Sequence, residues 1–239
     1  MRLTDFKVLS FGCYGTLIDR DAGVWTALKR LLAGDRIKLS RREVLAAFDR
    51  HQRRIEAASP ELTYRELLAQ AHSGLAKEWG VLCADAEHEL FGSSVPQWPP
   101  FALVPAALQY LKRYFRIAVL TNGDRESLAS SVRRLEARFD WVYTAEEIGS
   151  FKPDPRNFAF LLDRLGQLGY APGELLHVAA SVRRDLAPAA RLGIATAWIT
   201  RHADDADADK VDRTGGAPFS PHFSSLADSI KAHQEELRA

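Results

Sequence analysis

Short apolar runs recur along the chain, with stretches of helical periodicity between them. The runs cover residues 7–11, 116–120, 141–144, 175–179 and 194–200. Each has the length of a strand and is mostly apolar rather than alternating, which is typical of strands buried on both faces of a sheet. Helices between such strands imply right-handed crossovers. The pattern predicts an α/β fold built on a doubly wound parallel sheet.

The first two runs are separated by about a hundred residues, far more than a single crossover helix needs. Over residues 21–95 the apolar positions recur at helical spacing, as in Val24, Leu28 and Leu31. We therefore predict that an all-helical segment is inserted between the first and second strands.

Proline marks the end of this insertion. The Pro-rich stretch 96–100 breaks the helical pattern, and the α/β pattern resumes after it. These boundaries predict an α/β core formed by residues 1–20 and 96–239, with a helical cap at 21–95. Within the core, residues 202–216 are rich in Asp, Ala and Gly, which indicates a surface loop before a last amphipathic helix.

The composition indicates an ordinary globular protein. Hydrophobic residues make up 46% of the chain and charged residues 26%, and the formal net charge is +1, so no basic face for nucleic acid is expected. The N-terminal sequence enters a strand-like run directly and predicts neither a signal peptide nor a membrane span. Cys13 and Cys83 lack metal-ligand spacing and are expected to be free thiols. We expect a cytoplasmic location.

Polar groups follow four of the apolar runs, where ligands bind in an open parallel sheet. They are hydroxyls at Thr16 and Thr121, the amide of Asn122, the lysine Lys152 and the carboxylate of Asp185. Taken singly, each is more typical of a cap, a turn or a surface charge. Their common position at one edge of the sheet favours a site that binds an anion.

In this order, the residues resemble the four motifs of the haloacid dehalogenase-like superfamily. The first motif of its dehalogenase branch, Asp-x-Tyr-Gly-Thr-Leu, is similar to residues 12–17, but Gly12 stands where the motif has aspartate. Thr121-Asn122, Lys152-Pro153-Asp154 and Asp185 resemble the second, third and fourth motifs. The resemblance covers nearly the whole chain and implies a Rossmann-like core with an inserted helical cap.

Tyr14 distinguishes between branches of the superfamily. Phosphatases of this family have a second aspartate two residues after the nucleophile, which protonates the leaving alkoxide. This chain has Tyr14 there. A halide leaves without a proton, so the resemblance is to the type II 2-haloacid dehalogenases, which need no magnesium. It implies no cofactor and no metal.

In such dehalogenases an aspartate displaces the halide and forms an ester that water then hydrolyses. The resemblance implies a small anionic ligand, a carboxylate or a phosphate, and leaves a homodimer open. It also implies the following roles: the nucleophile position at Gly12, charge balance by Lys152, orientation of lysine and water by Asp185, and substrate or carboxylate binding by Tyr14, Thr16, Thr121, Asn122 and Ser181.

Glycine at position 12 has no side chain with which to attack substrate. Loss of a nucleophile costs on the order of 10⁶ in turnover in a well-studied hydrolase. Neither neighbouring candidate is a convincing substitute: Asp19 is expected beyond the site, and Cys13 is expected to point away from it. The fourth motif also departs, because residues 181–184 lack the asparagine that these dehalogenases tend to have.

Three interpretations follow. The first is a dehalogenase-like hydrolase that is inactive or strongly impaired because its nucleophile has been lost or replaced. The second is a non-catalytic protein that binds small anions, in which Lys152 is left unopposed by a carboxylate at position 12. The third is a phosphatase-like hydrolase with another nucleophile, which Tyr14 disfavours.

Overall fold

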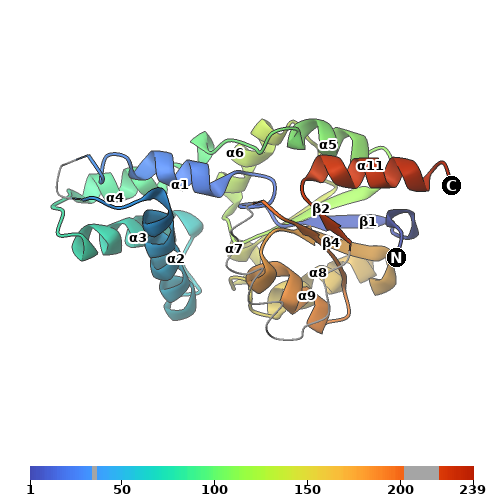
Figure 1. The fold of residues 1–239 in the computed structure, drawn as a ribbon. Coiled ribbons are helices and arrows are strands. Elements are labelled where there is room, and N and C mark those ends of the chain that lie inside the picture. Colours follow the sequence, from blue (N-terminus) through green and yellow to red (C-terminus); the bar gives the residue numbers. More distant parts are fainter. Residues whose placement is uncertain (34–36, 202–220) are drawn as a thin grey trace.

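The computed structural model describes residues 1–33, 37–201 and 221–239. Within these residues the chain forms a six-stranded parallel sheet of order β3-β2-β1-β4-β5-β6 (Figure 1). This confirms the predicted α/β fold class. The strands are β1 (Val8–Phe11), β2 (Arg116–Thr121), β3 (Trp141–Thr144), β4 (Leu175–Ala179), β5 (Ala195–Ile199) and β6 (His222–Phe223).

The five predicted runs correspond to β1 to β5, with ends that differ by a residue or so. Every residue of β1 and β4 is buried, as continuous apolar runs imply for strands with helices on both faces. The edge strand β6 was not predicted, because two residues, one of them His222, form no apolar run. The predicted loop at 202–216 lies outside the described residues.

Helices cover both faces of the sheet (Figure 1). One face carries α5 (Val104–Leu111), α6 (Arg125–Leu135) and α11 (Leu226–Glu236), and the other carries α8 (Arg156–Gln167) and α9 (Ala187–Arg191). The short helix α7 (Ala145–Ile148) follows β3 directly. The remaining short elements are η1 (Leu3–Asp5), η2 (Val95–Gln97), η3 (Pro172–Glu174) and the π-helical turn η4 (Val182–Leu186).

A group of helices between β1 and α5, which we call the helical insertion, lies beyond the carboxyl ends of the strands (Figure 1). Two of its helices begin with reciprocal caps: Ser40 with Glu43, and Thr63 with Glu66. Helix α3 packs against both α2 and α4. The insertion consists of α1 (Arg20–Leu28), α2 (Arg41–Ala58), α3 (Tyr64–Glu78) and α4 (Asp85–Gly92). Its treatment as a separate domain at 21–95 stays a prediction.

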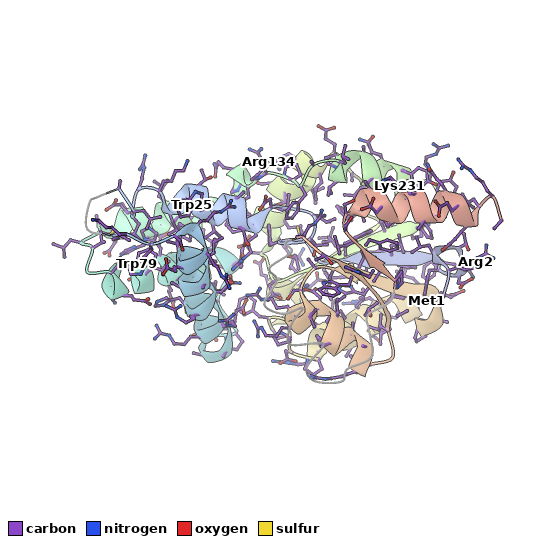
Figure 2. All side chains as sticks on the ribbon, in the orientation of Figure 1. Met1, Arg2, Trp25, Trp79, Arg134 and Lys231 are labelled. Carbon is purple, nitrogen blue, oxygen red and sulfur yellow. The ribbon has the colours of Figure 1, made fainter. Side chains whose placement is uncertain are left out.

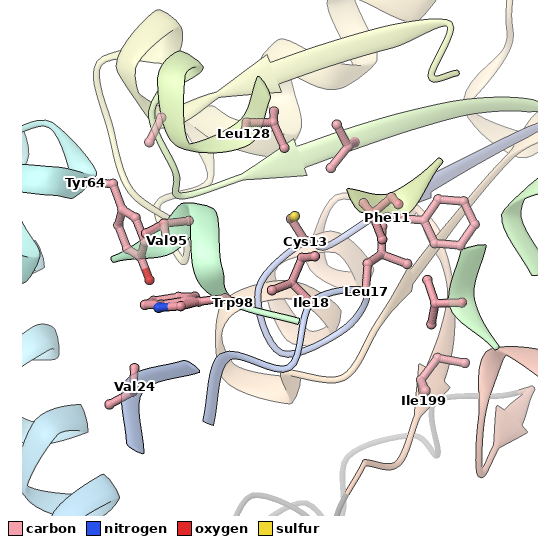
Figure 3. Packing of buried hydrophobic residues seen from close by; sticks show 14 of the residues in the cluster. Phe11, Cys13, Leu17, Ile18, Val24, Tyr64, Val95, Trp98, Leu128 and Ile199 are labelled. Carbon is pink, nitrogen blue, oxygen red and sulfur yellow. The ribbon is translucent and has the colours of Figure 1, made fainter. Parts of the chain in front are cut away.

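One hydrophobic cluster runs from the sheet into the insertion. It includes Phe11 of β1, Trp98 of the connecting segment and Val24 of α1, all buried (Figure 3). Charged side chains cover the outside of both parts, Lys231 of α11 among them (Figure 2). Among the described helices, none combines the length and the apolar character that a membrane span needs.

Candidate functional site at the carboxyl edge of the sheet

The predicted site residues come together where the central strands end. Strand β1 lies between β2 and β4, so the segments that follow these strands meet at one edge. There they enclose a small cavity of about 30 Å³, which we call the inner cavity. It is lined by Tyr14, Thr121, Asn122, Lys152, Ser181 and Asp185 from the core, and by Gln52 and Tyr64 from the helical insertion.

Gly12 directly follows β1, and the side of its backbone that would carry a side chain faces the site. A Cβ built on Gly12 would lie 3.1 Å from Thr16 Oγ1, 3.2 Å from Asp185 Oδ1 and 3.4 Å from Ala179 Cβ. Thr16 Oγ1 is itself held in place by the N–H of Ala180, which donates to it over 3.0 Å. A longer side chain at position 12 would therefore enter the group formed by Thr16 and Asp185.

Lys152 is not the unopposed cation that the anion-binding interpretation assumed. Its Nζ forms a buried ion pair with Asp185 and donates to the carbonyl oxygen of Leu120 over 2.7 Å. Asp185 also contacts His177 Nε2 at 3.2 Å, and His177 Nδ1 lies 2.8 Å from Ser10 Oγ. Both members of the pair are buried, so Asp185 is not a surface charge.

The electrostatics of this cluster follow from burial and from the close ion pair. Burial alone would raise the pKa of Asp185, but the Lys152 ammonium and the hydrogen bond from His177 outweigh it and lower that pKa to about 2. Burial lowers the pKa of His177, although Asp185 opposes the shift. At neutral pH Asp185 is therefore a carboxylate, and the lowered pKa of His177 favours its neutral imidazole.

Thr121 and Asn122 are placed at the end of β2, but their hydrogen bonds are mostly internal. Thr121 Oγ1 accepts from the N–H of Gly123 over 3.0 Å. The Asn122 amide accepts from the N–H of Lys152 over 2.7 Å and donates to the Lys152 carbonyl over 3.0 Å. It also donates to Glu56 of the insertion over 3.3 Å. Asn122 thus fixes the backbone that carries the lysine.

Tyr14 lines the inner cavity inside a group of aromatic rings. It stacks on Tyr64 with ring centroids 5.3 Å apart, and Trp98 meets it edge-on at 5.5 Å. Gly123 lies directly against the ring, because a Cβ there would come within 2.7 Å of Tyr14. Burial raises the pKa of Tyr14 well above its usual value, so the phenol stays neutral.

Sequence reasoning missed a polar network within the insertion, which reaches the core through the contact of Glu56 with Asn122. Arg20 pairs with Asp21 and Asp49 and donates to Gln52 over 2.8 Å. Gln52 in turn donates to the buried Glu56 over 2.8 Å. The helical spacing of Asp49, Gln52 and Glu56, all on α2, could have indicated one polar face.

Two further arginines border a second cavity of about 130 Å³, which we call the outer cavity. Arg184 follows Ser181, whose hydroxyl accepts from the Arg184 N–H over 3.1 Å. Arg201 follows β5 and donates from Nε to the carbonyl oxygen of Thr16 over 3.1 Å. Both arginines were missed because nothing in their spacing links them to the other motifs.

The neighbouring groups weighed as substitute nucleophiles are occupied otherwise. Asp19 caps α1 by accepting from the N–H of Ala22 over 2.9 Å. Cys13 is one of the residues that line the inner cavity, but its thiol is buried among hydrophobic side chains (Figure 3), and burial raises its pKa to about 12 although Lys152 opposes the shift. Cys13 and Cys83 are both free. Over residues 1–33, 37–201 and 221–239, no group of three or more His, Cys, Asp or Glu side chains could hold a metal ion.

Thr16, Thr121, Lys152 and Asp185 lie together beyond the carboxyl ends of a parallel sheet, an arrangement similar to that of the haloacid dehalogenase-like class. The model of the haloacid dehalogenase-like hydrolase family matches residues 6–193. The chain belongs to this family.

Two curated relatives show which members of this family the chain is similar to. The chain is 32% identical over 114 residues to (S)-2-haloacid dehalogenase 4A of Burkholderia cepacia, covering 47% of this chain and 45% of that protein. It is 28% identical over 127 residues to N-acylneuraminate-9-phosphatase of Rattus norvegicus, covering 50% and 45%. Each match thus spans about half of the relative's length.

The fold is similar to that of L-2-haloacid dehalogenase from Xanthobacter autotrophicus, with a TM-score of 0.76 and 19% identity over 96% of this chain and 98% of that one. The same enzyme with chloropropionic acid covalently bound gives a TM-score of 0.75 at 18% identity, with the same coverage. These structures support the fold. The chain is therefore a hydrolase-family protein related to 2-haloacid dehalogenases.

Proposed function

We propose that this chain is a 2-haloacid dehalogenase-type protein in which covalent hydrolysis is inactive or strongly impaired because Gly12 occupies the nucleophile position. The observation that carries this proposal is the direction of the missing side chain at Gly12. A Cβ there would point between Thr16 and Asp185, at the edge of the inner cavity. The other catalytic groups surround a position that has no group able to attack.

The substrate class rests on Tyr14 and on the relatives. Tyr14 stands where a phosphatase of this fold needs an acid, and burial raises its pKa well above the usual value, which makes the phenol a poor proton donor. One similar structure holds chloropropionic acid covalently bound in its own protein. We therefore assign a small 2-substituted carboxylate, rather than a phosphate ester, as the ligand of the ancestral reaction.

The remaining residues define what an aspartate at position 12 would do. Its carboxylate would attack the carbon that bears the halogen, forming a C–O bond as the C–halogen bond breaks and the halide leaves. Water would then attack the ester carbonyl, releasing the hydroxy acid and regenerating the aspartate. Lys152 would balance the charge of the new aspartate and of Asp185, and Thr16 would help to hold the new aspartate in place.

A second candidate function is non-catalytic binding of a small carboxylate. It is favoured by Lys152, whose ammonium has three N–H donors. Two of them are directed at Leu120 and Asp185, which leaves one for a ligand in the inner cavity. A cavity of about 30 Å³ exceeds the space that one water needs, and polar groups line it.

The test is halide release from a panel of 2-haloacids by the unchanged chain, by Gly12→Asp and by Gly12→Asn, with phosphate ester hydrolysis alongside. Asparagine matches aspartate in size and removes the nucleophile, so it controls for filling the space. We expect Gly12→Asp alone to release halide. Rapid release by the unchanged chain would refute the impairment. If Gly12→Asp releases no halide and hydrolyses no phosphate ester, the result would favour the binding role.

A further inference from the structure

The outer cavity lies beside the inner cavity and shares part of its wall. Tyr14, Arg20, Ser181 and Arg184 line both. We propose that the outer cavity is a second anion subsite formed by Arg184 and Arg201, so that the ligand of this chain is a short dicarboxylate. This inference rests on the proposed binding of a small carboxylate in the inner cavity.

The donors of Arg184 carry the proposal. Its Nε and Nη2 are buried, and among the described residues neither has a hydrogen-bond partner. The recorded ion pair of Arg184 is with Glu56, whose Oε1 lies 3.7 Å from Nε, beyond hydrogen-bond length. A buried guanidinium donor without a partner costs free energy, which a carboxylate would recover.

Arg201 adds a second cation that is already fixed in position. Its guanidinium lies 4.0 Å from the centre of the Phe101 ring and donates to the neutral carbonyl oxygen of Thr16. Burial lowers the pKa of Arg201 to about 10, opposed by Asp19, so the side chain is charged at neutral pH. Ordering this cation in advance reduces the entropy that a ligand must overcome.

Arg20 is not part of the subsite, although it lines both cavities. Its Nη1 and Nη2 are directed at Asp21, Asp49 and Gln52. The carboxylates of Asp21 and Asp49 also border the outer cavity. They repel a doubly charged phosphate more strongly than a singly charged carboxylate, so the charge around the cavity favours the carboxylate.

The two volumes indicate how the ligand is arranged. The inner cavity, about 30 Å³, has room for one carboxylate-sized group near Lys152. The outer cavity, about 130 Å³, has room for a second group carried on a short carbon chain. A four-carbon dicarboxylate such as succinate therefore fits the pair of cavities better than a monocarboxylate of the same length.

Calorimetric titration of the full chain with succinate, butyrate and inorganic phosphate tests this assignment. We expect succinate to bind at least about tenfold more tightly than butyrate or phosphate. Arg184→Gln and Arg201→Gln should each remove that advantage. Because Arg201 borders only the outer cavity, Arg201→Gln should leave butyrate binding unchanged, and Arg201→Lys should keep part of the advantage. Arg191→Gln, an exposed arginine on α9, is the matched control and should bind like the unchanged chain.

Each alternative outcome has a distinct meaning. Equal affinity for succinate and butyrate would overturn the second subsite and leave the proposed function standing. A preference for succinate that survives both glutamine variants, or tighter binding of phosphate, would also overturn it. No binding of any of the three would overturn the subsite together with the proposed carboxylate binding. Thermal unfolding of each variant confirms that it is folded.

Discussion

The Lys152–Asp185 pair and the Arg184–Arg201 pair lie on adjacent walls of the same site but differ in how their charges are compensated. The ammonium of Lys152 has a buried carboxylate and a carbonyl as partners. Arg184 has buried donors that no described residue accepts from, and Arg201 donates to a neutral carbonyl. The charges of the first pair are compensated within the protein, whereas the second pair keeps donors for the anion that we propose it binds.

Removing the carboxylate of the first pair should have the largest effect. Asp185→Asn leaves the Lys152 ammonium buried without an anion, so we expect it to lower the free energy of unfolding by about 3–5 kcal/mol in urea titrations. Asp163→Asn, at an exposed position on α8, is the control and should change it little. A loss below about 1 kcal/mol for Asp185→Asn would show that the pair is not needed for stability.

The contribution of the Asp185 carboxylate to stability should also depend on pH. The pKa of Asp185, about 2 when folded, lies below its unfolded value, so its contribution to stability is complete above about pH 4 and is lost as the pH falls toward 2. This contribution is about 2–3 kcal/mol. The stability difference between the unchanged chain and Asp185→Asn should therefore shrink as urea titrations are moved from pH 7 to pH 3. A constant difference would contradict the lowered pKa.

Adding a second carboxylate beside Lys152 should have an intermediate effect. A Cβ at position 12 approaches Thr16 and Asp185 closely, so we expect Gly12→Asp to cost about 1–3 kcal/mol of unfolding free energy. Gly12→Ala measures the cost of adding the Cβ alone. Gly12→Asn has the volume of aspartate without its charge, so the difference between Gly12→Asp and Gly12→Asn measures the effect of the charge. Identical stabilities for Gly12→Asp and Gly12→Asn would mean that Lys152 fully compensates both carboxylates.

The smallest effect is expected at the arginine pair. Arg184→Gln removes donors that have no hydrogen-bond partner among the described residues, so unfolding free energy should change by less than about 1 kcal/mol. Arg20→Gln is the informative control, because it breaks contacts to Asp21, Asp49 and Gln52 and should cost more. If Arg184→Gln lowers the free energy of unfolding more than Arg20→Gln does, Arg184 contributes to stability and does not differ from the Lys152–Asp185 pair in the way described above.

The sheet could be predicted from the sequence because strands buried on both faces are mostly apolar, as β1 and β4 are apart from Ser10 and His177. The residues at the strand ends followed from topology, since parallel strands bring their carboxyl ends to one edge. The family resemblance already implied that Asp185 orients Lys152. The burial of this pair and the hydrogen bond from Lys152 to the Leu120 carbonyl could not be predicted, because they depend on side-chain positions. Glu56 was missed for the same reason: periodicity places a residue on a face of a helix and does not say what that face meets.

The contact between Tyr14 and Gly123 ties together two positions that are far apart in the chain. Any side chain at position 123 would overlap the Tyr14 ring. An aromatic residue at position 14 therefore requires glycine at position 123. We expect a larger residue at position 123 to be tolerated only together with a smaller residue at position 14.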